Sequence, residues 1–226
     1  IPGRRDRTYF GAWFTGGADR DPTWLILQGR YVASPFGEQG NATIYRFRQT
    51  GASPFTVSSE VVGSATIAPA GRQRIVLSWT VDGQSGAEIL DKLYPQRGPA
   101  PDRTGAWYNP GESGWGPIVD DHVLNGANES VIINYNYGTD GTARWTLGAS
   151  PDLNQGAMSL STFRVHCPTC PSFPDFFDLP LPAGNLNRSF CSQTRGTSSS
   201  NSAVANPPLS WIRNNLPIEM ISRPSQ

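Results

Sequence analysis

The stretch TGAWYNPGESGWGPIV, residues 104–119, is the most patterned run of this chain. It places Trp107 and Trp115 on either side of the dipeptide Pro110-Gly111. Proline fixes its own φ and glycine tolerates positive φ, so this dipeptide is typical of a tight turn between two short strands. The stretch therefore predicts a β-hairpin that opens an all-β module.

The same stretch has two interpretations as a site. In the first, which is purely structural, Trp107 and Trp115 pair across the hairpin and each buries on the order of 200 Å². In the second, Trp107, Tyr108 and Trp115 form an aromatic platform that stacks on a sugar ring or an apolar ligand. Asn109 and Glu112 would add polar contacts to that platform. The sequence leaves both interpretations open.

Composition narrows the class of protein. Of the 226 residues, 37% are hydrophobic and only 16% are charged, below the usual quarter. The formal net charge is zero, so we expect no nucleic-acid partner. No apolar run approaches the ~18 residues of a membrane-spanning helix, so we expect no membrane insertion. The 24 glycines and 20 prolines favour many turns and few long helices.

Strand periodicity is clearest in ESVIINYNYG, which starts at Glu129. Successive side chains of a strand point to opposite faces. This stretch therefore puts Ile132, Asn134 and Asn136 on one face, and Val131, Ile133, Tyr135 and Tyr137 on the other. Asp-Gly pairs at 82–83 and 140–141 predict hairpin turns, because glycine accepts the positive φ that such turns need.

Three blocks of sequence recur in the same order, which indicates an internal repeat. The matched blocks are 12–29 with 133–149, 40–48 with 156–164, and 76–93 with 208–223. The first match sets Asp19 and Trp24 on Asp140 and Trp145, and the third sets Trp79 on Trp211. Recurrence at matched positions favours a core role for these four tryptophans.

The repeat predicts two tandem, related antiparallel modules, either barrel-like or sandwich-like, over residues 1–97 and 98–226. The second would carry a Cys- and Pro-rich loop insertion over 167–208. The first begins at the block that follows the opening hairpin in the second, so we expect it to lack that hairpin. Its strand edge near residues 9–14 should then be covered by β-pairing from another segment or a neighbouring copy. A rival register, DRTYFGAW against DRTGAWYNP, breaks the downstream Asp-to-Trp spacing.

The pattern TGAWYNPGESGWG…YNYGTDGTARW resembles a Trp-rich module of secreted and surface proteins of GC-rich proteobacteria. In that module a WWNPxESGWG hairpin precedes WFTYDxxGxPxW. The resemblance implies an extracytoplasmic location and no particular activity. TGAWYNPGES is also similar to the opening strand of avidin and streptavidin barrels, TGxWYNxxGS. That second resemblance covers one strand and implies an eight-stranded meander barrel, not biotin binding.

All three cysteines lie late in the chain, at Cys167, Cys170 and Cys191. In an extracytoplasmic protein they predict a disulfide from Cys191 to Cys167 or Cys170, with one thiol left over. The alternative is a zinc site with His166 and three thiolates, but only one pair of closely spaced ligands is present. We expect no metal ion and no other cofactor.

Catalytic motifs are weak. Ser113 lacks the preceding glycine of a nucleophile elbow, so we assign no catalytic residue. The expected function is a non-catalytic binding or assembly module of a bacterial surface or secreted protein, with a carbohydrate or an apolar compound as ligand. One alternative is a carbohydrate-active or other hydrolytic enzyme that uses Glu112 with Asp120 or Asp140 as an acidic pair. Another is a structural subunit of an extracellular oligomer or fibre, formed by self-association. The chain starts at Ile1 without a methionine, so we expect a processed product or part of a longer protein.

Overall fold

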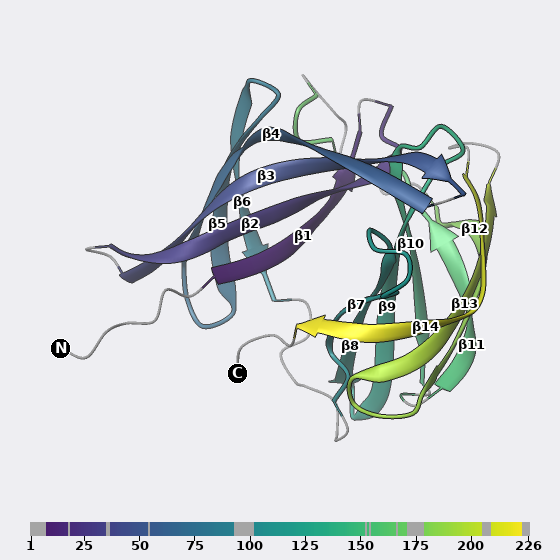
Figure 1. Ribbon diagram of the computed structural model, residues 1–226. Coiled ribbons are helices and arrows are strands. Elements are labelled where there is room, and N and C mark those ends of the chain that lie inside the picture. The colour runs from purple at the N-terminus through teal and green to yellow at the C-terminus, as the bar shows by residue number, and fades with distance from the viewer. Residues whose placement is uncertain are drawn as a thin grey trace.

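The computed structural model describes residues 8–17, 19–34, 37–53, 55–92, 102–151, 153, 155–165, 167–170, 179–204 and 209–222. The regular structure in these ranges consists of strands β1 to β14. They form a curled six-stranded antiparallel sheet and a closed eight-stranded barrel (Figure 1). The expected all-β class with two barrel-like modules is confirmed, and the second module is a barrel rather than a sandwich.

The sheet runs in chain order from β1 to β6. Its inner face carries a core that includes Leu25, Ile44 and Trp79, and Trp13 packs against this core. The alternate residues of β2, Trp24 and Ile26, face the barrel and belong to a different core. The strands are β1 (Thr8–Gly16), β2 (Pro22–Ser34), β3 (Gly37–Ala52), β4 (Phe55–Pro69), β5 (Arg74–Val81) and β6 (Gln84–Asp91).

The barrel is an up-and-down meander in which the last strand pairs with the first. Closure leaves no open edge, because every strand has two neighbours. Its strands are β7 (Gly105–Tyr108), β8 (Gly116–Leu124), β9 (Ala127–Tyr137), β10 (Ala143–Ser150), β11 (Gln155–Thr162), β12 (Leu181–Phe190), β13 (Arg195–Val204) and β14 (Leu209–Ser222).

Tight turns connect the strands where the sequence supplies residues for positive φ. Asp82 and Gly83, with φ of 50° and 77°, join β5 to β6, as expected. Asn125 and Gly126 join β8 to β9 in the same way. In the opening hairpin, β8 crosses close to β7 at Gly116, where a Cβ would lie 2.1 Å from the carbonyl oxygen of Trp107.

The β1–β2 and β9–β10 hairpins have the same turn. In the first, the amide of Gly17 donates to the carbonyl of Asp21 at 2.9 Å. In the second, the amide of Gly138 donates to the carbonyl of Thr142 at 2.8 Å. The fourth residue of each turn has positive φ, 63° at Arg20 and 77° at Gly141. Trp24 and Trp145 then occupy the same place in the two hairpins, opposite Phe14 and Tyr135.

These two hairpins also contact each other through reciprocal hydrogen bonds. The indole of Trp24 donates to the carbonyl of Asn136 at 3.3 Å, and the indole of Trp145 donates to the carbonyl of Thr15 at 3.4 Å. A second reciprocal pair of hydrogen bonds, between backbone groups, lies one strand further on. There the amide of Gln49 donates to the carbonyl of Gly141 at 2.9 Å, and the amide of Val165 donates to the carbonyl of Arg20 at 3.1 Å. Equivalent parts of the sheet and the barrel thus form an interface with approximate two-fold symmetry.

Aromatic rings fill this interface in matched pairs. Trp24 lies 5.6 Å from Phe47, and Trp145 lies 6.1 Å from Phe163, between ring centroids. The burial of Trp24, Trp145, Trp79 and Trp211 confirms their predicted core role. The third sequence block does not occupy matched strands, however, since Trp79 lies on the fifth strand of the sheet and Trp211 on the last strand of the barrel.

Candidate functional site

The residues predicted to form an aromatic platform do not form one. Trp107 is fully buried inside the barrel, whereas Trp115 is fully buried in the core between barrel and sheet. The two rings therefore neither pair with each other nor face solvent, because each packs in a different hydrophobic core. Asn109 stabilises the turn, where its side-chain oxygen accepts from the amide of Gly111 at 2.7 Å. Tyr108 is half-buried at the end of β7.

Glu112 has a structural partner that the sequence did not reveal. Its carboxylate accepts hydrogen bonds from the indole of Trp115 at 3.1 Å and from Nε of Arg213 at 2.9 Å. Arg213 in turn lies 4.0 Å above the ring of Trp211. The carboxylate of Glu112 therefore links the opening hairpin to β14 through Arg213.

The predicted disulfide of Cys191 is wrong. Cys167 is bonded to Cys170, and Cys191 is an exposed free thiol. The reason is the length of β12, which runs from the end of the barrel near Cys170 to the turn at Cys191. At ~3.4 Å per residue, ten residues of strand separate cysteines far beyond the ~7 Å that a disulfide spans. His166, of the alternative zinc site, lies outside the described residues. No group of three or more His, Cys, Asp or Glu side chains in the described ranges could hold a metal ion.

The structure instead brings polar side chains together inside the barrel. Ile132 belongs to the interior core, so Asn134 and Asn136, which follow it at alternate positions of β9, face the same interior. Both asparagines are completely buried. Thr146 is the cross-strand partner of Asn134 on β10 and is completely buried as well.

Two further strands add to this polar layer. On β11, Thr162 follows Leu160 of the interior core. On β13, Ser200 and Ser202 lie opposite Leu186 and Gly184 of β12. On β14, Trp211 is the register partner of Ser202, but its ring packs in the core between barrel and sheet, 5.7 Å from that of Trp115. The layer therefore draws on β9, β10, β11 and β13.

Many polar atoms of this layer are buried and find no hydrogen-bond partner among the described residues. They are both amide atoms of Asn134 and of Asn136, and the hydroxyls of Thr146, Thr162, Ser200 and Ser202. A buried polar group without a partner costs about 1–3 kcal/mol, and native interiors hold few of them. Such a concentration indicates that the layer is built to contact a polar guest, either water or a ligand.

The interior of the sheet is different at the matched positions. Where the barrel has Asn134 and Thr146, the sheet has Trp13 and Leu25, which pack against its apolar core. At these matched positions the inner face of the sheet carries bulky apolar side chains, whereas the barrel interior carries small polar ones. The rest of the barrel interior holds an apolar core of Trp107, Val119, Ile132, Met158, Leu160, Leu186 and Ile218, followed by the buried polar side chains of Asp121, Ser130 and Arg188.

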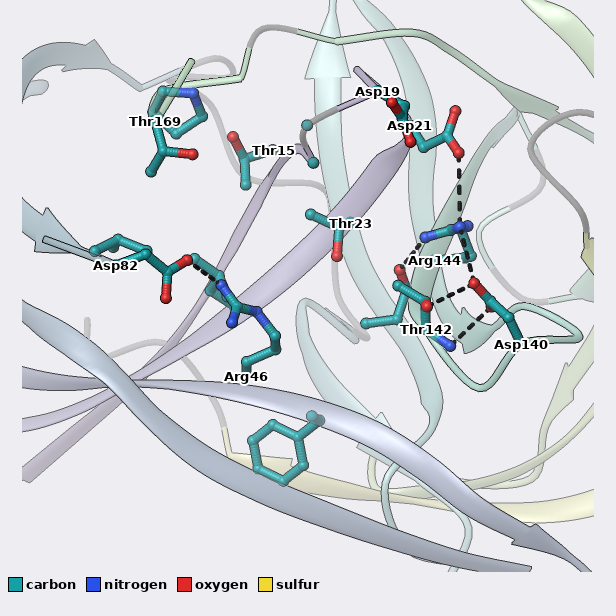
Figure 2. A pocket seen from close by; sticks show the side chains of 17 residues that line it. Thr15, Asp19, Asp21, Thr23, Arg46, Asp82, Asp140, Thr142, Arg144 and Thr169 are labelled. Carbon is teal, nitrogen blue, oxygen red and sulfur yellow. Dashed lines mark hydrogen bonds and ion pairs between the residues drawn. The ribbon is translucent and has the colours of Figure 1, made fainter. Parts of the chain in front are cut away.

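A second polar feature is a cavity of about 390 Å³ between the sheet and the barrel (Figure 2). Nη2 of Arg144 lies 3.6 Å from the carboxylate of Asp21 and 3.7 Å from that of Asp140, so one cation bridges the two modules. On the other side of the cavity, Arg46 pairs with Asp82 and with Glu60.

The two carboxylates beside Arg144 differ in their electrostatics. Burial raises the pKa of Asp21 above its usual value, although Arg144 acts in the opposite direction. Burial also acts to raise the pKa of Asp140, but hydrogen bonds from Thr142 outweigh it and the net shift is downward. Those bonds come from the amide of Thr142 at 2.9 Å and its hydroxyl at 2.7 Å. Opposite shifts of two nearby carboxyl groups are typical of acid–base pairs.

Neither a family model, nor a curated protein, nor a solved structure matches this chain. The described ranges contain no helix with the length and apolar character needed to cross a bilayer.

Proposed function

We propose that this protein is an extracytoplasmic, non-catalytic binding protein whose barrel holds a small, uncharged, hydrogen-bonding ligand. The observation that carries the proposal is the layer of buried, unpartnered polar atoms inside the barrel. Specific small-molecule sites combine an apolar wall with a few convergent polar groups. The barrel has both, because the polar layer adjoins the apolar core around Met158 and Leu160.

The donor and acceptor inventory defines the ligand class. Carboxamides and hydroxyls each both donate and accept. Such groups recognise amide, urea or hydroxyl functions and offer no counter-charge to an ion. A neutral sugar or a cyclic amide fits this chemistry, whereas a purely apolar compound would leave the polar atoms unpartnered at the cost given above.

The extracytoplasmic location rests on the disulfide between Cys167 and Cys170, because disulfides persist in oxidising compartments. Few charged residues and zero net charge suit a binding protein that needs no electrostatic steering.

The proposal is tested by adding neutral monosaccharides and cyclic amides to the intact protein and recording saturation-transfer NMR. We expect at least one class to bind and to lose binding in Asn134→Leu, with the fold monitored by circular dichroism. Asn109→Leu is a matched control in the turn, outside the barrel interior. A crystal structure that shows only ordered water at these atoms, together with no binding by either class, would overturn the proposal.

A second candidate function is hydrolysis of a glycosidic bond by Asp21 and Asp140. The observation in its favour is that the two carboxylates line one cavity, share Arg144 and have pKa values shifted in opposite directions. Asp21 would be the acid and Asp140 the base or nucleophile. Turnover of nitrophenyl glycosides that is lost in Asp140→Asn and kept in Asp82→Asn would favour this function over binding alone.

A further inference from the structure

The cavity of about 390 Å³ lies at the inner face of the sheet, where the β1–β2 hairpin ends. Its walls there include Thr15 and Thr23, which are cross-strand partners in this hairpin (Figure 2). Each lies two residues from a side chain of the inner face, Trp13 or Leu25, and therefore points to the same face. Leu25 itself lines the cavity. The cavity is thus continuous with the inside of the curled sheet.

On the barrel side, Arg144 leads from the cavity into the barrel. Arg144 and Asn136 are cross-strand partners on β10 and β9, at the positions that match Thr23 and Thr15 in the sheet. Asn136 and Thr146 belong to the buried polar layer of the barrel, and Arg144 leaves the wall on the same face as both. Arg144 also lines the cavity. One side chain therefore borders both polar features.

The guanidinium of Arg144 has donor capacity that the protein itself does not use. Its Nη2 lies 3.6 and 3.7 Å from the carboxylates of Asp21 and Asp140, beyond the roughly 2.7–3.2 Å of a hydrogen bond. Its Nε is buried and has no hydrogen-bond partner among the described residues. The side chain is only 8% exposed, so bulk water does not satisfy these donors. A ligand at this point would gain hydrogen bonds from a preformed donor.

The chemistry of the cavity walls favours a ligand with several hydroxyl groups. The carboxylates of Asp19, Asp21 and Asp140 only accept hydrogen bonds, whereas the guanidinium of Arg144 only donates. A hydroxyl can donate to a carboxylate and accept from the guanidinium at the same time. A sugar unit offers several such hydroxyls, whereas a cyclic amide has few N–H donors for so many carboxylates. The cavity volume lies within the range of small-molecule pockets, roughly 300–1,000 Å³.

We propose that the polar layer and the cavity form one elongated site for a neutral oligosaccharide, with one sugar unit in the barrel and the next in the cavity. Arg144 lies at the junction and donates to the chain there. The inference rests on the barrel ligand proposed above and narrows its class, because a single ring or a cyclic amide in the barrel would leave the cavity unused. The sheet then contributes to binding through Thr23 and Asp21, which line the cavity.

The test compares ligands of increasing length by calorimetry on the intact protein. The probes are glucose, galactose and N-acetylglucosamine, each with its β-1,4-linked dimer and trimer. We expect at least one series to gain about tenfold in affinity from monomer to dimer, because the second unit makes hydrogen bonds of its own.

Variants of the cavity locate the second unit. Thr23→Tyr places a ring in the cavity and should reduce the affinity of the dimer to that of the monomer. Ile89→Tyr, at a site on β6 that is 67% exposed, is the matched control and should keep the gain. Asp21→Asn, which preserves size, should also reduce the gain and keeps the test available if Thr23→Tyr does not fold. Arg144→Gln should weaken the dimer more than the monomer.

The outcomes separate this inference from the barrel proposal. A monomer that binds as tightly as its dimer and trimer would overturn the elongated site and leave the barrel ligand in place, and binding of cyclic amides alone would do the same. An unchanged gain in both Thr23→Tyr and Asp21→Asn would mean that the second unit lies outside the cavity, and would also overturn the inference. If neither saccharides nor cyclic amides bind, the barrel proposal fails and the elongated site fails with it.

Discussion

Single hydroxyls inside the barrel can be tested one at a time, and Thr146 is the most informative. Its hydroxyl is buried without a partner among the described residues, so Thr146→Val removes a desolvation cost and keeps the shape of the side chain. We expect the ligand-free protein to gain about 1 kcal/mol in free energy of unfolding, measured with urea. The control is Thr104→Val, which removes a hydroxyl that is hydrogen-bonded to Asp121 and should cost about 1 kcal/mol. Equal losses in both variants would mean that Thr146 has a partner in the ligand-free protein.

The tyrosines of β9 predict instability at alkaline pH. Burial raises the pKa of Tyr135 and of Tyr137 above the usual value of 10.0, and their hydroxyls donate to the carbonyls of Trp107 and Gly114. The unfolded chain releases these protons at a lower pH than the native protein, so the native state binds more protons and stability falls as pH rises above 10. Urea unfolding at pH 7, 9 and 11 measures this slope. Tyr137→Phe should make the slope shallower at the cost of about 1 kcal/mol at pH 7, and an unchanged slope would contradict the assignment.

Among the elements, the loop after β11 carries the disulfide. Cys167 and Cys170 enclose a very short loop, so the chain-entropy model gives about 2 kcal/mol for the bond. The double variant Cys167→Ser/Cys170→Ser should lose no more than about that amount of stability. Cys191→Ser should leave stability unchanged, because its thiol is exposed. Titration of native protein without reductant should find one reactive thiol, and two or more would contradict the pairing.

How far the elements follow from sequence depends on whether the signal is local. Alternation in residues 129–138 predicts which side chains of β9 share a face, and the pair Asp82-Gly83 predicts its turn, because each depends only on neighbours in the chain. The pairing of Cys191 and the burial of Trp107 and Trp115 depend on where strands end in space. The polar layer could have been suspected from the asparagines of ESVIINYNYG, but its members on β10, β11 and β13 converge only when the barrel closes.

The whole molecule combines a closed barrel with an open sheet of similar design. Their matched hairpins bury aromatic rings against each other, so part of each module's stability lies in the shared interface. The barrel interior contains buried polar groups in place of part of an apolar core, and the described strands of the sheet do not close into a barrel. Departures of this kind from a fully satisfied core are expected at functional sites.

The shared interface predicts that sheet and barrel unfold together. Trp24 lies on β2, yet its indole donates to carbonyls of Asn136 and Arg144 in the barrel, at 3.3 and 3.0 Å. Trp24→Ala should therefore cost about 3–5 kcal/mol and lower hydrogen-exchange protection in β9 and β10 as well as in β2. Trp145→Ala should do the same from the barrel side, because its indole donates to Thr15. Trp79→Ala is the control within the sheet, since its ring packs against Trp13 of the same sheet and should affect the sheet first. If the barrel kept full protection in Trp24→Ala, the two modules would be energetically independent and the symmetric contacts would contribute little to stability.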